Sequence, residues 1–138
     1  MLKKSLLIIS LAVAASLTVG GLLAPTPALA QQAKVSKKVG EPLAEALALG
    51  KKGQYGPALT KLKAADAVSG KTAFEQFKIN ETYGFIYSQQ RNYAAAAAAF
   101  EKSLSSGQLP AGQVNDRLKQ LAQLNFQSPR NLNKVVEY

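Results

Sequence analysis

A repeat with a period of 38 residues constrains the fold of this chain most. It pairs an aromatic, a small and a large apolar residue with similar residues 38 positions later: Tyr55, Ala58, Leu62, Tyr93, Ala96 and Phe100. A period of this length is typical of helical-hairpin arrays, in which each hairpin buries its apolar face only by stacking on the next. The repeat therefore predicts an all-α solenoid of stacked hairpins.

The apolar residues around the repeat follow a helical period, and no segment alternates apolar and polar residues as a half-buried strand would. Six helices are predicted, at about 41–52, 57–68, 72–89, 93–104, 112–126 and from 132 onward. They pair into two and a half to three hairpins, over residues 41–70, 72–107 and 111–138. Residues 31–40, which are polar and basic, are expected to form a flexible arm before the first hairpin.

The predicted third helix carries the clearest local signals. Thr72 followed by Glu75 matches a capping box, in which each residue satisfies a free backbone N–H of the other. Apolar residues from Phe74 to Tyr87 are too numerous for a single stripe. A helix that is apolar on more than one side must pack between neighbours. We therefore expect this helix to lie in the middle of the domain.

The middle hairpin resembles the tetratricopeptide repeat (TPR) family. The matching residues are Tyr83-Gly84-Phe85-Ile86-Tyr87 followed by Asn92-Tyr93, Ala96 and Phe100. The resemblance implies that Gly84 and Ala96 allow close helix crossing while Tyr87 and Phe100 fill the space around them. The first hairpin has Glu45 where the family has a large apolar residue, and the period exceeds the usual value of about 34. The match is strong in the middle of residues 41–138 and weak at both ends.

The resemblance also implies a binding surface, because TPR ligands usually lie in the concave groove formed by the first helix of each hairpin. The groove residues implied for this chain are Lys51, Lys78, Phe85, Gln89, Arg117 and Leu124. Their mixture of apolar and cationic side chains suits an extended or helical peptide with acidic character. The two-carboxylate clamp of chaperone-binding members is not expected, since Leu43 and Leu47 occupy its positions.

The first thirty residues match a secretory signal peptide. Lys3 and Lys4 precede an apolar stretch, and Ala28-Leu29-Ala30 provides the small residues that signal peptidase requires. Cleavage after Ala30 predicts a periplasmic or secreted protein that is not inserted in the membrane. The alternative is an N-terminal inner-membrane anchor, because residues 5–24 carry no charge.

The chain contains no Cys and no His, which excludes thiolate nucleophiles, imidazole catalysis and Cys/His metal sites. No glycine motif for a phosphate or a dinucleotide is present, so no cofactor is expected. In an exported protein the net charge of +9 indicates solubility, an acidic protein partner or an anionic envelope polymer, rather than nucleic acid.

Two functions are therefore considered. The first is a non-enzymatic scaffold module of the cell envelope that binds a protein or peptide. The alternative is a hydrolase of envelope polysaccharide that uses paired carboxylates, with Glu41/Glu45 and Glu75/Glu81 as candidates.

The sequence ends within the predicted third hairpin, where Val135, Val136 and Tyr138 do not form the polar cap that a solenoid needs. We expect either that the sequence is a fragment of a longer repeat protein or that this edge is covered by self-association with a second copy.

Overall fold

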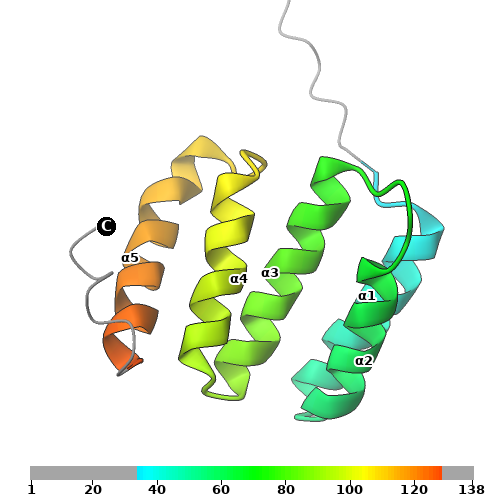
Figure 1. The fold of residues 1–138 in the computed structure, drawn as a ribbon, viewed down its shortest axis with the longest axis horizontal. Helices are drawn as coiled ribbons and strands as arrows, with labels where there is room; N and C mark the ends of the chain where they lie inside the picture. Colours follow the sequence, from blue (N-terminus) through cyan, green and yellow to red (C-terminus); the bar gives the residue numbers. More distant parts are fainter. Residues whose placement is uncertain (1–33, 129–138) are drawn as a thin grey trace, which may run out of the picture. The chain divides into compact units, whose positions relative to one another are not determined.

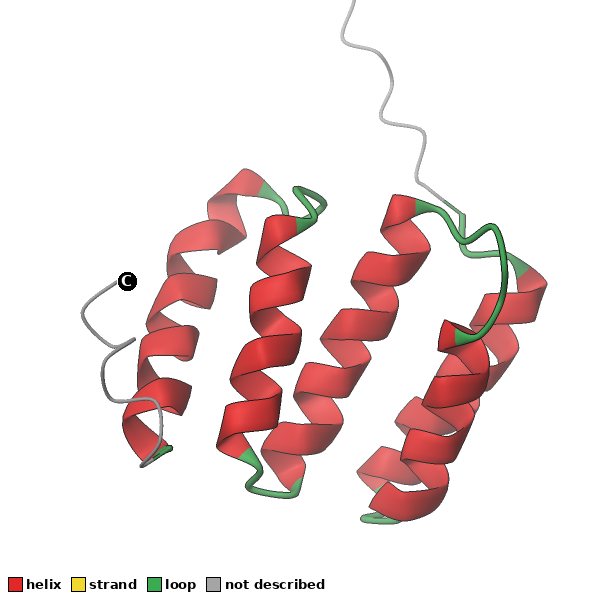
Figure 2. Ribbon diagram, in the orientation of Figure 1, coloured by secondary structure: helices red, strands yellow, loops and turns green. Residues whose placement is uncertain are grey.

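Five α-helices make up the described part of the chain, residues 34–128 of a computed structural model (Figure 1). Their bounds are α1 Lys37–Lys51, α2 Tyr55–Asp66, α3 Ala73–Gln89, α4 Tyr93–Ser105 and α5 Ala111–Gln127. No strand occurs within these residues (Figure 2), which confirms the all-α prediction. The predicted signal peptide and the helix predicted from Leu132 both lie outside the described residues.

The helices pack in chain order, so that each one contacts the next (Figure 1). α1 also contacts α3, the first helix of the following hairpin. α1–α2 and α3–α4 are consecutive helical hairpins, and α3 lies between α1 and α2 on one side and α4 on the other. The prediction that the third helix packs between neighbours is confirmed.

The 38-residue period extends to the backbone of the two hairpin turns. Gln54 N–H donates to the Leu49 carbonyl at 3.0 Å, and Asn92 N–H donates to the Tyr87 carbonyl at 2.9 Å. The two N-cap residues also share one conformation, with φ −85° and ψ 65° at Gln54 and φ −84° and ψ 71° at Asn92. The turns of the two hairpins therefore share one backbone conformation.

Two apolar cores hold the helices together. The first joins α1, α2 and α3 through Val39, Leu43, Ala46, Ala58, Leu62, Ala65, Ile79 and Ile86, with Tyr55 packed against it. The second joins α4 and α5 through Ala96, Ala97, Phe100, Leu121 and Leu124, with Tyr87 and Tyr93 packed against it. Because Ile79 and Tyr87 contact different cores, α3 connects the two.

The crossing of α3 and α4 depends on Gly84. A Cβ atom at this position would lie 2.6 Å from two ring carbons of Phe100. The guanidinium carbon of Arg117, on α5, lies 4.1 Å from the centroid of the same ring. Phe100 therefore occupies space that only a glycine leaves open, and it links three helices.

The first helix begins earlier than predicted. α1 starts at Lys37, inside the segment predicted as a flexible arm, so the predicted start at Glu41 is wrong by four residues. Val39 is fully buried in the first core, and Val35 packs against it. These apolar contacts favour a helical turn over an exposed arm, and as a result Pro42 lies inside the helix.

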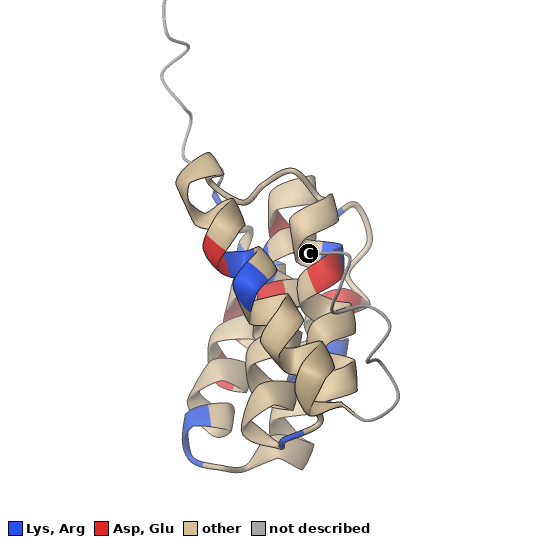
Figure 3. Cartoon of the chain, turned by 90° about the vertical axis from the view of Figure 1, so that its left-hand side faces the viewer, with Lys and Arg blue, Asp and Glu red and all other residues tan. Residues whose placement is uncertain are grey.

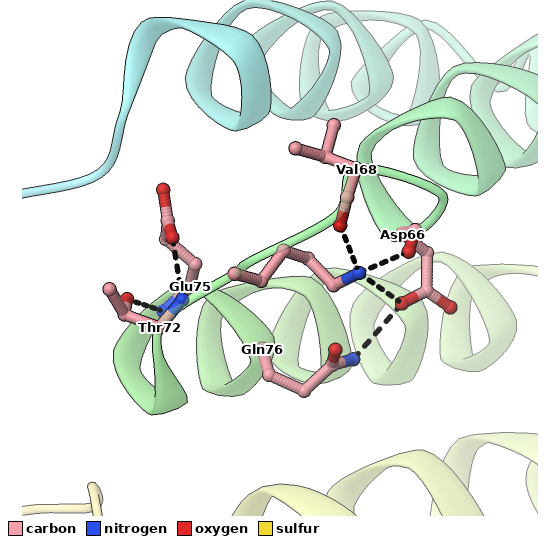
Figure 4. Close-up of polar contacts among 6 residues, drawn as sticks. Asp66, Val68, Thr72, Glu75 and Gln76 are labelled. Atoms are coloured by element: carbon pink, nitrogen blue, oxygen red, sulfur yellow. Dashed lines mark hydrogen bonds and ion pairs between the residues drawn. The ribbon is translucent and has the colours of Figure 1, made fainter.

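A single carboxylate holds the beginnings of α1 and α3. Glu75 accepts hydrogen bonds from the backbone N–H of Thr72 at 2.8 Å and of Ser36 at 2.7 Å. Thr72 in turn accepts from Glu75 N–H at 3.1 Å, which confirms the predicted capping box (Figure 4). These hydrogen bonds to Ser36 and Thr72 lower the pKa of buried Glu75 from 4.5 to about 2.

Replacing Gly84 with Ala should destabilise the domain by about 1–3 kcal/mol, because the new methyl group would overlap the Phe100 ring. Gly112→Ala is the matched control, since a Cβ there meets nothing within 4 Å. The control should raise the free energy of unfolding by up to about 1 kcal/mol, because alanine lowers the conformational entropy of the unfolded chain. Urea unfolding measures both changes, and equal stability of Gly84→Ala and the unchanged protein would contradict this helix crossing.

Replacing Glu75 with Gln should lower the thermal unfolding midpoint at neutral pH. A carboxylate with a lowered pKa contributes its full stabilisation above pH 4.5, and the contribution disappears as the pH falls to about 2. The difference between Glu75→Gln and the unchanged protein should therefore shrink over that interval. Glu41→Gln is the control, because Glu41 is exposed. A pH-independent difference at Glu75 would contradict the double-capping role.

Candidate functional site

A groove of about 950 Å³ opens between α2 and α4, with α3 as its floor. α2 and α4 make no packing contact with each other, so the space above α3 stays open. The groove is lined by Lys63, Asp66, Gln76, Asn80, Tyr83, Tyr87, Ala95, Ala98, Ala99, Glu101, Lys102, Ser105 and Ser106. Ligand sites in proteins have volumes of roughly 300–1,000 Å³, so this groove can hold a ligand of substantial size.

The floor of the groove is one stripe of α3. Gln76, Asn80, Tyr83 and Tyr87 are spaced by four, three and four residues, which places them on one helical face. The rings of Tyr83 and Tyr87 stack, with centroids 5.8 Å apart and an interplanar angle of 14°. The floor therefore offers two amide side chains followed by a flat aromatic surface.

The wall on α4 is made by alanines. Ala95, Ala98 and Ala99 line the groove, and Ala98 is exposed within it. The run from Ala94 to Ala99 favours helix, and its small side chains allow close packing. Because an alanine side chain ends at Cβ, the run also leaves open the space that larger residues would fill.

Tyr83 is held in its neutral form. Burial, the negative charge of Asp66 and neighbouring Tyr87 together raise its pKa to about 12. The phenol of Tyr83 therefore remains a hydrogen-bond donor throughout the physiological range, and it does not act as a base.

Polar contacts fix the rim of the groove at the α2–α3 turn (Figure 4). The Lys71 amine donates to the backbone carbonyls of Asp66 and Val68, at 2.7 Å for Val68. The Gln76 amide donates to a carboxylate oxygen of Asp66 at 3.1 Å. These bonds close the end of α2 and use part of the hydrogen-bonding capacity of Asp66 and Gln76.

None of the six groove residues implied by the family resemblance lines this groove. Lys51 and Gln89 are exposed at the ends of α1 and α3. Lys78 is half-buried, with its amine 5.3 Å from the ring centroid of Phe74 and 5.6 Å from that of Phe77. These cation–π contacts stabilise α3 locally.

The other three implied residues are occupied in packing. Phe85 packs against the first core, and Leu124 is buried in the second core, so Leu124 is not available to a ligand. Arg117 stacks on Phe100 and forms an ion pair with Glu81 at 2.7 Å. Leu124 is buried because the apolar face of α5 turns toward α4.

Each of the candidate catalytic carboxylates has a polar partner of its own. Glu41 pairs with Lys37 at 3.5 Å and Glu45 pairs with Lys61 at 2.6 Å, both at exposed positions. Glu75 caps two helices. Acidic and basic residues are interspersed along the helices (Figure 3).

Within residues 34–128, no three acidic side chains gather in a way that could hold a metal ion. None of the five helices described there has the length and apolar character needed to cross a membrane.

The sequence reasoning missed the groove residues because it assigned Tyr83, Tyr87 and the alanines to packing. The signal was nevertheless present, since a polar and aromatic stripe on one helix faces a run of alanines on the next. No protein-family model, curated protein or solved structure matches this chain.

Proposed function

We propose that this chain is a non-enzymatic interaction module of the TPR type that binds a segment of a partner protein. Three observations support the TPR assignment. The hairpin turns repeat at 38 residues in both sequence and backbone hydrogen bonds. The helices pack in chain order with an added α1–α3 contact. Gly84 and Phe100 meet at the crossing that the family signature implies.

The groove between α2 and α4 carries the functional proposal. Its stacked tyrosines and alanine wall form an apolar surface, and its lysines and amides supply polar contacts at the edges. This combination is typical of sites that bind a peptide by shape and a few hydrogen bonds. We place the site here because, of the six residues that the family resemblance implies, only Lys51 and Gln89 are exposed.

The signal-like first thirty residues support a location in the periplasm or outside the cell. The partner would then be an envelope or secreted protein, which this module recruits or scaffolds. The positive net charge of the chain favours a partner of acidic character.

Filling the groove tests this function. Ala98→Leu places a larger side chain inside the groove, and Ala64→Leu places the same side chain at an exposed position of α2 outside it. Both residues favour helix, so both variants should fold normally. The amount of polypeptide captured from an envelope extract should fall at least about tenfold for Ala98→Leu, which corresponds to a loss of about 1.4 kcal/mol in binding free energy.

Capture by Ala64→Leu should equal that of the unchanged protein. The same polypeptides captured at the same level by both variants would contradict binding in the groove. An extract from which the unchanged protein captures nothing would contradict the interaction role in that compartment.

A further inference from the structure

We infer that the groove binds an extended peptide whose main chain is held by Asn80 and whose apolar centre is flanked by acidic residues. The inference rests on the proposed function of the groove and adds the chemistry of the ligand. It is carried by the hydrogen bonding of Asn80, by the geometry of the floor and by the charges of the two rims.

Asn80 lies on the groove floor without a partner. Its side chain is only 8% exposed, yet within residues 34–128 its amide makes no hydrogen bond. Its amide atoms are not among the fully enclosed polar atoms that lack a partner in the described residues, so they reach the open space of the groove. An Asn side chain offers one acceptor and two donors, which match the N–H and C=O of a single peptide unit. A ligand main chain would satisfy both groups at once.

This requirement favours an extended ligand over a helical one. A helix pairs its own N–H and C=O groups and has none to offer along its length. An extended or polyproline II segment leaves these groups free.

The floor sets the length and the centre of the ligand. From Gln76 to Tyr87 it runs about 16 Å, at 1.5 Å per helical residue. About five residues of extended chain cover that distance. The stacked rings of Tyr83 and Tyr87 offer a flat apolar surface, on which a proline or another apolar side chain can lie.

The rims supply the preference for acidic flanks. Lys63 on α2 and Lys102 on α4 line the groove, and within the described residues neither forms an ion pair. Of the two acidic residues that line the groove, Asp66 forms an ion pair with Lys71 at 3.9 Å, and Glu101 has an interaction of its own. Carboxylates at the two ends of the ligand would pair with Lys63 at one rim and Lys102 at the other.

Peptide selection on the full-length chain tests the inference. Random peptides of about seven residues, long enough to pass both ends of the floor, are displayed on phage and selected on the immobilised protein. Enriched sequences should have an apolar or proline-containing centre with acidic residues on both sides. The best of them is then made as a fluorescent peptide and as a series with one backbone nitrogen methylated at a time.

Methylation at one position should weaken binding about tenfold by removing the N–H that Asn80 accepts. Asn80→Leu keeps the size of the side chain and should weaken binding of the unmodified peptide by a similar factor. In this variant, methylation at that position should have no further effect. If Asn80→Leu does not fold, the methylation series on the unchanged protein still decides. Lys63→Ala with Lys102→Ala should weaken binding about fivefold. Lys38→Ala with Lys52→Ala removes the same charge at exposed positions outside the groove and should have no effect.

The outcomes separate the two proposals. Suppose that the peptides bind the Ala98→Leu variant less tightly than the unchanged protein. If they also tolerate methylation at every position, or carry no acidic flanks, this inference is overturned and the proposed function still stands. If the enriched peptides bind the Ala98→Leu variant as tightly as they bind the unchanged protein, the proposed function is overturned, and this inference with it.

Discussion

The contact between Gly84 and the Phe100 ring determines how the second hairpin is built. Because a Cβ at Gly84 would lie 2.6 Å from ring carbons of Phe100, α3 and α4 pack at a distance that no larger residue allows. Arg117 covers the same ring and pairs with Glu81, so the contact also connects α5 to α3. Ring packing of this kind depends on shape, and a protein interior that is close-packed responds to a single added methyl group. The position of α4 relative to the α3 stripe, and therefore the groove, follows from this contact.

The groove itself results from small side chains placed beside large ones. Tyr83 and Tyr87 project from α3 on one side of the hairpin, and the alanines of α4 leave the space beside them open. The first hairpin shows the contrast. Its residue 38 positions before Tyr83 is Glu45, which forms an ion pair with Lys61 between α1 and α2. The two hairpins share a backbone, but only the second has a surface suited to an apolar ligand. The groove thus depends on the sizes of the side chains that α3 and α4 place beside each other.

Much of the fold could be predicted from the sequence, because its signals are local. The capping box at Thr72 and Glu75 was predicted and is present. At the α3–α4 crossing Ala96 was expected to face Gly84, with Phe100 beside them, whereas the nearest atoms to Gly84 belong to the Phe100 ring. The start of α1 was misplaced because residues 31–40 are polar and basic as a group. In the structure Val39 is buried in the first core and Glu75 accepts a hydrogen bond from Ser36 N–H, so the helix begins earlier. The groove could not be predicted, because an alanine run has the same pattern whether it packs closely or borders a cavity. That distinction depends on the distance between α2 and α4, which no local sequence pattern encodes.

The close approach of Gly84 and Phe100 can be measured directly by nuclear magnetic resonance. One α-hydrogen of Gly84 points where a Cβ would lie, toward the Phe100 ring. This account predicts strong nuclear Overhauser effects between that hydrogen and the ring hydrogens, together with a ring-current shift that separates Gly84 from the exposed Gly112. Replacing Phe100 with Leu should remove the shift. A Gly84 α-hydrogen with an ordinary chemical shift and no cross-peak to the ring would contradict the account, because α4 would then not pack against α3 as described.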